Sequence, residues 1–298
     1  MSIQKSGMIA LVGRPNVGKS TLTNALVGEK VTIVTSKPQT TRNRICAILN
    51  RGETQFVFVD TPGLHRARTK LGEYMVGVVK QSVADVDALC LLVEPIPNIG
   101  VAEAELIGRI RELGVPALLV INKMDTVKKE ELLAVMQTYA GALEWTAILP
   151  ISAKNGEGLE ELLSILEQLV PEGPQLFPDD MVTDQPERQV MAEILREKLL
   201  LSLDKEIPHG TAVEITKFSQ REDTGIIDVH ATIFCEKESH KGIIIGKGGE
   251  MLRKVSTRAR QDMERFMGER VYLETWVKVK ENWRDSLNLV RNFGYGDE

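Results

Sequence analysis

Gly13–Ser20 reads GRPNVGKS, which fits the pattern G-x-x-x-x-G-K-S. Glycines at these positions let successive backbone N–H groups turn inward around phosphate oxygens, and Lys19 can then reach the outer phosphates. The apolar run Met8–Val12 before the loop predicts a strand, and Thr21–Val27 after it predicts a helix. Bound phosphates would therefore meet the N-terminus of a helix, where free N–H groups and the helix dipole favour anions.

The overall composition is that of a soluble globular protein. The chain has 298 residues, 43% of them hydrophobic and 27% charged, which is room for two domains of ordinary size. Its three cysteines, Cys46, Cys90 and Cys235, show no metal or redox spacing and suit a reducing cytosol. We find no signal-peptide pattern and no apolar run near the roughly 18 residues of a spanning helix, so a cytoplasmic protein is expected.

Strands and helices alternate through the first half of the chain. Apolar runs predict strands at 54–59, 88–93, 117–121 and 146–151, and helical patterns lie around 71–83, 102–113 and 159–169. Such alternation predicts an α/β domain with a largely parallel sheet and ligand-binding loops at the carboxyl ends of its strands.

Two motifs at the ends of predicted strands indicate a guanine nucleotide. Asn122–Asp125 is NKMD, and the Asp125 carboxylate can accept from both N1–H and N2–H of guanine, donors that adenine does not offer in that arrangement. Ser152–Lys154 is SAK, in which the Ala153 N–H can meet guanine O6. These motifs predict GTP rather than ATP as the ligand.

A third motif and a polar segment are expected around the terminal phosphate. Asp60–Gly63 is DTPG, where Asp60 can hold Mg²⁺ through water and the Gly63 N–H can meet the γ-phosphate. Lys37–Arg42, KPQTTR, lies between the two phosphate motifs, and one of its threonines should coordinate Mg²⁺ together with Ser20. We favour Thr41, and Thr40 remains an alternative. With GDP bound, the same residues would form a solvated polar loop.

These motifs together define the predicted nucleotide site. The residues expected to bind GTP are Gly13, Asn16, Val17, Gly18, Lys19, Ser20, Thr21, Asp60, Thr61, Pro62, Gly63, Asn122, Lys123, Asp125, Ser152, Ala153 and Lys154, and those expected to act in hydrolysis are Lys19, Ser20, Thr41, Asp60 and Gly63. No residue can be nominated as a general base.

A proline-rich and acidic stretch separates the two halves of the chain. Val170–Gln185 reads VPEGPQLFPDDMVTDQ, which is typical of an interdomain linker. We therefore predict a nucleotide-binding domain at residues 1–170, a linker at 171–185 and a second domain at 186–298. Helical apolar spacing at 187–203 opens the second domain.

The second domain is centred on Gly246–Gly249, GKGG. A strand is predicted before it at 226–234 and another after it at 270–279, and helices are predicted on either side, at 240–245 and 250–267. A G-x-x-G turn between two helices is the centre of a KH domain, where it clamps the backbone of single-stranded RNA. A side chain at these glycines would hold the phosphates away.

The charge of this region supports the same interpretation. Between Lys237 and Arg260 there are seven basic and two acidic residues, in a chain whose net charge is −5. Such a run is often only a solvated helix face, but beside a glycine turn it favours RNA phosphates. The residues predicted to bind RNA are Lys241, Ile243, Ile244, Ile245, Gly246, Lys247, Gly248, Gly249, Arg253 and Lys254.

Both halves resemble one family. GRPNVGKS, KPQTTRNR, DTPG, NKMD and SAK, followed by GIIIGKGGEMLRKV and RVYLETWVKVKENWR, are similar to the Era family of bacterial GTPases. The resemblance implies a Ras-like α/β P-loop GTPase domain with a mixed, mostly parallel sheet, followed by a smaller α+β KH domain of type II. It also implies a monomeric, GTP-hydrolysing protein that binds the 3′ end of 16S ribosomal RNA and acts in assembly of the 30S ribosomal subunit. Peripheral association with the inner membrane is compatible with the same resemblance.

Two positions in the nucleotide half bear on hydrolysis. Leu64 follows DTPG where Ras-type proteins carry the glutamine that orients water, and the family shares this apolar residue, so intrinsic hydrolysis should be slow or assisted by another group. Asn16 matches an asparagine that helps hold K⁺ in related potassium-dependent GTPases, which would make K⁺ a second ion beside Mg²⁺. The alternative for Asn16 is a loop residue that caps its own backbone.

The sequence leaves two rival functions open. One is a signalling or membrane-associated GTPase whose C-terminal domain binds protein. The other is a metabolic P-loop kinase, which NKMD disfavours because a kinase would have no use for guanine recognition.

Overall fold

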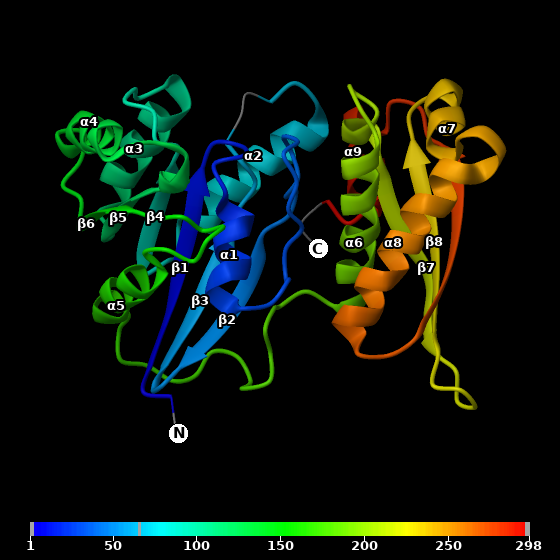
Figure 1. Cartoon of the computed structure of the whole chain (residues 1–298), viewed down its shortest axis with the longest axis horizontal. Helices are drawn as coiled ribbons and strands as arrows, with labels where there is room; N and C mark the ends of the chain where they lie inside the picture. Colours follow the sequence, from blue (N-terminus) through cyan, green and yellow to red (C-terminus); the bar gives the residue numbers. More distant parts are fainter. Residues whose placement is uncertain (1–2, 65–66, 296–298) are drawn as a thin grey trace. The chain divides into compact units, whose positions relative to one another are not determined.

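The computed structural model describes residues 3–64 and 67–295. Residues 1–2 of the predicted first domain and 296–298 of the predicted second domain therefore lie outside the described ranges. The chain divides into two compact units (Figure 1). The first unit ends at Asp184, and the main part of the second unit begins at Gln185. Two stretches from the first half, Ile33–Thr40 and Ala67–Tyr74, group with the second unit.

The first unit is built on a six-stranded sheet in the order β2-β3-β1-β4-β5-β6. Strand β2 is antiparallel to β3, and every other pair is parallel, which confirms the mixed, mostly parallel sheet. The strands are β1 (Lys5–Gly13), β2 (Ile45–Arg51), β3 (Thr54–Asp60), β4 (Ala88–Val93), β5 (Ala117–Ile121) and β6 (Ala147–Pro150).

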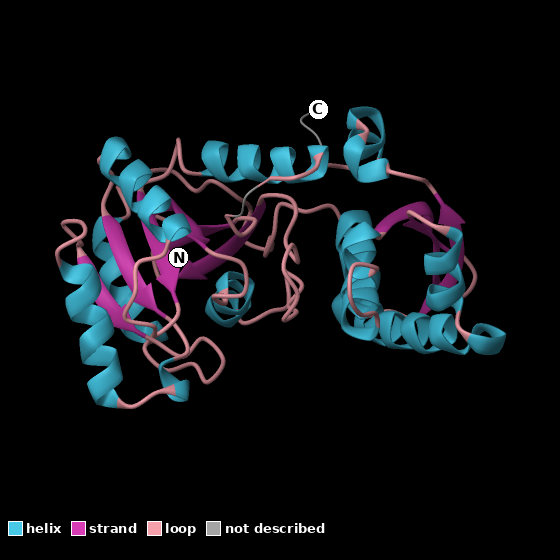
Figure 2. Cartoon of the chain, turned by 90° about the horizontal axis from the view of Figure 1, so that it is seen from above, coloured by secondary structure: helices cyan, strands magenta, loops and turns pink. Residues whose placement is uncertain are grey.

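Helices cover both faces of this sheet (Figure 2). They are α1 (Lys19–Val27), α2 (Lys70–Ser82), α3 (Val101–Leu113), α4 (Lys129–Ala140) and α5 (Leu159–Leu169). Helices α1 and α5 pack on the face that carries Phe56 and Leu118, and α3 and α4 pack on the face that carries Leu89 and Leu119. Because β1, β3, β4 and β5 are covered on both sides, they are buried along nearly their whole length.

The stretch between Val170 and Gln185, predicted as a linker, lies along the first unit. The side chain of Gln55 on β3 accepts hydrogen bonds from the backbone N–H groups of residues 176 and 177. Further on, Ile48 N donates to the Val182 carbonyl at 3.0 Å, and Cys46 N donates to Asp184 at 3.0 Å. The last part of this stretch therefore follows the outer edge of strand β2 up to the end of the unit.

The second unit is a three-stranded sheet with helices α6, α7 and α8 packed on one face. Its elements are α6 (Glu187–Ser202), β7 (Ala212–Gln220), β8 (Ile227–Cys235), α7 (Glu238–Ile245), α8 (Glu250–Met267), β9 (Val271–Val279) and α9 (Leu287–Asn292). Strand β8 lies between β7, to which it is antiparallel, and β9, to which it is parallel. Neither β7 nor α9 was predicted from the sequence, and the same is true of β2 and α4 in the first unit.

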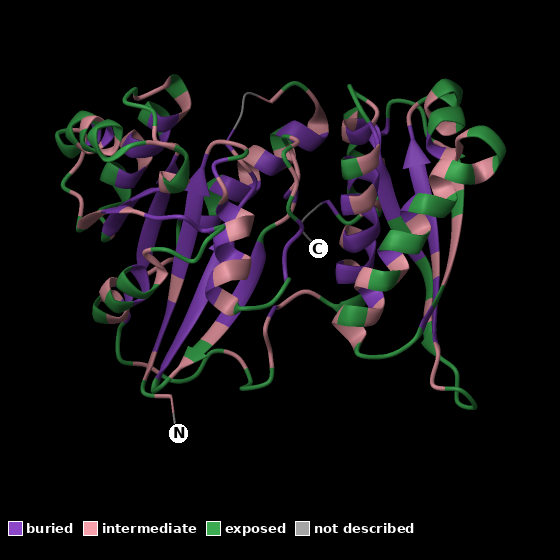
Figure 3. Cartoon of the chain, in the orientation of Figure 1, coloured by how far each residue is buried: buried purple, intermediate pink, exposed green. Residues whose placement is uncertain are grey.

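Helix α8 is amphipathic, and its two faces have different roles. Val255, Ala259 and Met263 are four residues apart and fully buried against the sheet, together with Leu195 and Leu199 of α6. Its opposite face is exposed over much of its length (Figure 3). The apolar side therefore fixes the helix on the sheet and leaves its basic side chains at the surface.

Candidate functional site

The loop between β1 and α1 contains glycines that their surroundings leave no room to replace. Gly13 has φ 153°, and a Cβ atom there would lie 2.5 Å from the Leu92 carbonyl oxygen. Gly18 has φ 99°, and a Cβ atom would lie 2.2 Å from Asn122 Nδ2. Both the backbone angles and the packing therefore require glycine at the two ends of the GRPNVG stretch.

Lys19 spans this loop from the first residue of α1. Its Nζ donates to the carbonyl oxygens of Gly13 at 3.1 Å and of Arg14 at 3.0 Å. The NKMD motif holds the other side of the loop, since Lys123 Nζ donates to the Asn16 carbonyl at 2.7 Å. With these carbonyls engaged, the backbone N–H groups of the loop are left to form an anion-binding concavity.

Two buried charges lie beneath the loop. Burial lowers the pKa of Lys19 to about 8, against the attraction of Asp60, and burial raises the pKa of Asp60 to about 6, against the attraction of Lys19. Within the described residues, neither carboxylate oxygen of Asp60 is in a hydrogen bond of ordinary geometry. A buried carboxylate in this state is suited to a cation or to the water that a cation holds.

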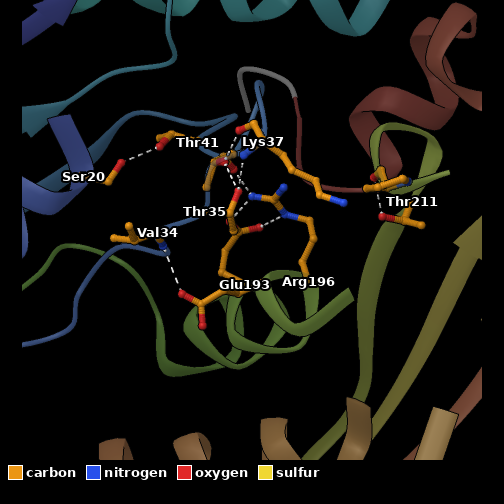
Figure 4. Close-up of polar contacts among 11 residues, drawn as sticks. Ser20, Val34, Thr35, Lys37, Thr41, Glu193, Arg196 and Thr211 are labelled. Atoms are coloured by element: carbon orange, nitrogen blue, oxygen red, sulfur yellow. Dashed lines mark hydrogen bonds and ion pairs between the residues drawn. The ribbon is translucent and has the colours of Figure 1, made fainter. Parts of the chain in front are cut away.

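The hydroxyl groups of Ser20 and Thr41 lie together beside this carboxylate. Their oxygen atoms are 2.9 Å apart (Figure 4). The Thr40 hydroxyl instead contacts the Thr35 hydroxyl at 2.7 Å and the Lys37 carbonyl at 2.6 Å. The geometry therefore favours Thr41 over Thr40. Two hydroxyls and a nearby carboxylate form the all-oxygen set that Mg²⁺ prefers, so the residues fit that ion.

The stretch Ile33–Thr40, which precedes Thr41, is held by helix α6. Val34 N donates to Glu197 Oε1 at 3.0 Å, and the fully buried Arg196 donates to the Thr40 carbonyl (Figure 4). Lys37 donates to a carbonyl just after the same helix. These contacts explain why the stretch groups with the second unit although it adjoins the nucleotide motifs in sequence.

Asn122 joins three loops of the first unit. Its Nδ2 donates to the Val17 carbonyl at 2.8 Å, and its Oδ1 accepts from Ala153 N at 3.0 Å. The NKMD and SAK motifs are also tied by a backbone bond from Met124 N to the Ile151 carbonyl at 3.0 Å. Beside them, Asp125 is exposed and available to a base.

The DTPG segment approaches the first loop closely. Leu64 N donates to the Gly13 carbonyl at 3.2 Å, and a Cβ atom on Gly63 would lie 2.6 Å from Pro15 N. Thr61 is fully buried and bonds to the Leu11 carbonyl, so its side chain serves the fold. Leu64 is also buried, which leaves no side-chain polar group at the position where a glutamine would orient water.

The glycine turn of the second unit is more open. Helix α7 ends at Ile245, and Gly246, Gly248 and Gly249 have φ of 75°, 59° and 80° before α8 begins. A Cβ atom on Gly246 would lie 2.7 Å from Met251 Cβ, but one on Gly248 or Gly249 would meet nothing within 4 Å. The last two glycines therefore face open space.

The predicted RNA-binding residues fall into two groups. Lys247, Arg253 and Lys254 are exposed, and Ile243 is half exposed on α7. Ile244 is fully buried in the core of the unit, so its side chain serves packing here, and its predicted contact with RNA stays a prediction. In an α-helix, neighbouring residues point in different directions, so a run of three isoleucines cannot all face a ligand.

Sequence reasoning also missed three charged residues around the first loop. Arg14 forms an ion pair with the buried Glu103 of α3, and Glu94, just after β4, pairs with Lys123 at 2.6 Å. Arg14 lies within the quoted motif, but nothing in the spacing of the two glutamates marks them as its neighbours. In the described part of the chain, no group of three or more histidine, cysteine, aspartate or glutamate side chains could hold a metal ion.

Comparison with known proteins matches each half of the chain to a family. Residues 8–123 match the family described as 50S ribosome-binding GTPase, and residues 206–284 match the KH domain family. GTPase Era of Ruminiclostridium cellulolyticum is 47% identical over 98% of this chain and 97% of its own length. The chain belongs to the Era family of GTPases. Era of Clostridium kluyveri is similarly close, with 48% identity over 98% of this chain and 99% of its own.

Solved Era structures have the same fold throughout. Era in complex with MgGDPNP and nucleotides 1506–1542 of 16S ribosomal RNA superimposes with a TM-score of 0.94 at 38% identity, over 99% of this chain and all of that one. An Aquifex aeolicus Era variant bound to GDP and AlF4⁻ also gives 0.94 at 38% identity, over 98% of this chain and all of its own. No helix in the described residues is long and apolar enough to cross a membrane.

Proposed function

We propose that this protein is a GTP-dependent factor that binds the 3′ end of 16S ribosomal RNA during assembly of the 30S ribosomal subunit. The observation that carries the proposal is the presence, in one chain, of a formed phosphate loop and an open glycine turn beside exposed basic residues. The similarity to the Era structure that holds both a GTP analogue and this RNA segment supports the pairing of the two ligands.

In the nucleotide site, the geometry supports a role for several of the predicted residues. Lys19 and the loop N–H groups would bind the phosphates, and Asp125 would bind guanine. Ser20 and Thr41 would hold Mg²⁺, with Asp60 reaching it through water. Mg²⁺, when bound, neutralises charge that develops on the transferred phosphoryl group.

In the second unit, the RNA backbone would lie against the glycine turn, and the basic side chains would neutralise the RNA phosphates. The exposed Lys247, Arg253 and Lys254 around an open turn favour this reading over a protein-binding domain. The proposal therefore ranks above a signalling GTPase whose C-terminal domain binds protein. Family resemblance alone supports a monomeric state and any peripheral membrane contact.

The test is to crosslink the full-length protein to RNA in cells and to sequence the adducts. Adducts should concentrate at the 3′ end of 16S ribosomal RNA, and a Gly248→Asp variant expressed at the same level should lose them. Adducts spread evenly over cellular RNA, or equal in the wild type and the variant, would refute the proposed target.

A second part of the proposal concerns K⁺. Asn16 is exposed on the phosphate loop and has φ 66°, so it lies where an ion beside the phosphates could be held. Replacing K⁺ by Na⁺ should slow GTP turnover, and Asn16→Ala should remove the difference. Equal wild-type rates in the two salts would rule out this role and leave Asn16 as a loop residue.

A further inference from the structure

A buried ion pair outside the known motifs supports the phosphate loop from behind. Glu103 lies in the first turn of α3, its side chain is only 2% exposed, and it pairs with the Arg14 guanidinium. Removing a carboxylate from water costs several kcal/mol unless it is paired, so a buried glutamate at this position requires a partner. The pKa of Tyr139 is raised to about 12, mainly by burial of its hydroxyl and in addition by the negative charge of Glu103.

A second carboxylate extends this arrangement. Glu94 lies 3.9 Å from the Arg14 guanidinium, and its other oxygen accepts from Lys123 Nζ at 2.6 Å. The same Lys123 nitrogen donates to the Asn16 carbonyl. Glu103 and Glu94 thus hold two basic side chains by ion pairs. Arg14 belongs to the phosphate loop, and Lys123 is hydrogen-bonded to that loop.

The position of Arg14 matters because of what its neighbours touch. The Arg14 carbonyl accepts from Lys19, so the residue is fixed to the lysine that binds phosphate. Pro15, the next residue, leaves no room for a side chain on Gly63, whose Cβ would come within 2.6 Å of it. The path of Arg14 and Pro15 therefore sets how closely the DTPG segment approaches the phosphate loop.

We propose that Glu103 is a positioning residue for GTP hydrolysis, which acts through Arg14 to keep the Gly13–Pro15 backbone at a fixed distance from Gly63. With GTP bound, the N–H of Gly63 would meet the γ-phosphate, whereas GDP has no group at that position. Loosening the pair should therefore slow hydrolysis more than it weakens GDP binding.

The test compares Glu103→Gln, which keeps the shape but removes the charge, with Glu105→Gln as a matched control. Glu105 is on the same helix and is paired with Arg109 at the surface. The Glu103 variant should lower kcat by about tenfold to a hundredfold, the scale for small misplacements of reacting groups. Its GDP affinity, measured by fluorescence titration, should stay within threefold of wild type, and the Glu105 variant should match wild type in both.

A double-mutant cycle with Arg14→Gln tests whether the effect passes through the arginine. If it does, the double variant should be no slower than the slower single variant, because the two changes remove one interaction. If Glu103→Gln does not fold, Arg14→Gln alone should show the same loss of kcat with GDP affinity retained. An unchanged kcat, or a kcat and GDP affinity that fall together, would overturn the proposal.

Discussion

The two glycine loops of this protein use glycine for different reasons. In the phosphate loop, a Cβ on Gly13 would come within 2.5 Å of a backbone oxygen and one on Gly18 within 2.2 Å of Asn122. In the turn of the second unit, a Cβ on Gly248 or Gly249 would meet no atom within 4 Å. The first loop needs glycine because of the protein around it, whereas the second is open to solvent at Gly248 and Gly249.

This difference shows how a binding loop can be recognised. A loop whose glycines are packed from inside is held in one shape before its ligand arrives, as the bonds from Lys19 and Lys123 also indicate. A loop with open glycines is shaped by its own backbone angles and keeps its surface clear. Substitutions should therefore act on the fold in the first loop and on ligand contact in the second.

The largest expected effect is a complete loss of RNA binding without loss of GTP turnover. Gly248→Asp places a negative side chain in the open space where phosphate would pass, so RNA binding should fall below detection while GTP turnover stays near wild type. Binding would be measured by fluorescence anisotropy with a short single-stranded RNA, and turnover by phosphate release. Normal RNA binding by this variant would show that the RNA-binding site does not include the turn.

Alanine at one glycine in each loop sharpens the comparison. Gly18→Ala should lower GTP turnover by about a hundredfold or more, because the added methyl group displaces Asn122 and with it the loop. Gly248→Ala should leave turnover unchanged and lower the free energy of unfolding by only about 1–2 kcal/mol, the cost of a left-handed backbone angle. Turnover assays and denaturant titration would measure both, and similar losses in the two variants would break the contrast.

The exposed residue of the nucleotide site should show an intermediate effect. Asp125→Asn replaces a carboxylate with an amide, which cannot accept both guanine donors, so GTP affinity should fall by roughly 2–4 kcal/mol. The amide can pair with xanthine instead, so affinity for xanthine nucleotides should rise. Competition binding would measure the affinities for GTP and for xanthine nucleotides, and an unchanged GTP affinity would show that NKMD does not bind the base.

The smallest effect is expected at one basic side chain of α8. Lys254→Ala should weaken binding of all RNA sequences by a similar factor and reduce the slope of log affinity against log salt by about one unit. A matched change at Lys128, exposed in the first unit, should leave the slope unchanged. A sequence-dependent loss would mean that Lys254 contacts a base rather than a phosphate.

The sequence predicted most of the motifs and where they stand on strands and loops. This was possible because a phosphate loop, DTPG, NKMD and SAK each need fixed residue types over a few neighbouring positions. Strand β2 (Ile45–Arg51) was missed, since it is a short apolar run directly after a polar stretch and pairs with β3 across a tight turn at Gly52.

What the sequence could not show depends on contacts between distant residues. The pattern favoured Thr41 without excluding Thr40, and the 2.9 Å separation between the hydroxyls of Ser20 and Thr41 supports that choice. The burial of Ile244 depends on how α7 is turned toward the sheet, which three equivalent isoleucines do not reveal. The pairing of Arg14 with Glu103 links a loop and a helix that are distant in sequence.

The stretch between Val170 and Gln185 also protects an exposed edge. Strand β2 is the last strand of its sheet, and unpaired N–H groups on such an edge can recruit another chain and start aggregation. Here Ile48 N is bonded to Val182 and Cys46 N to Asp184, so the edge is covered. A fragment cut at residue 170 would lose this cover and be prone to self-association, whereas one cut after Asp184 would keep it.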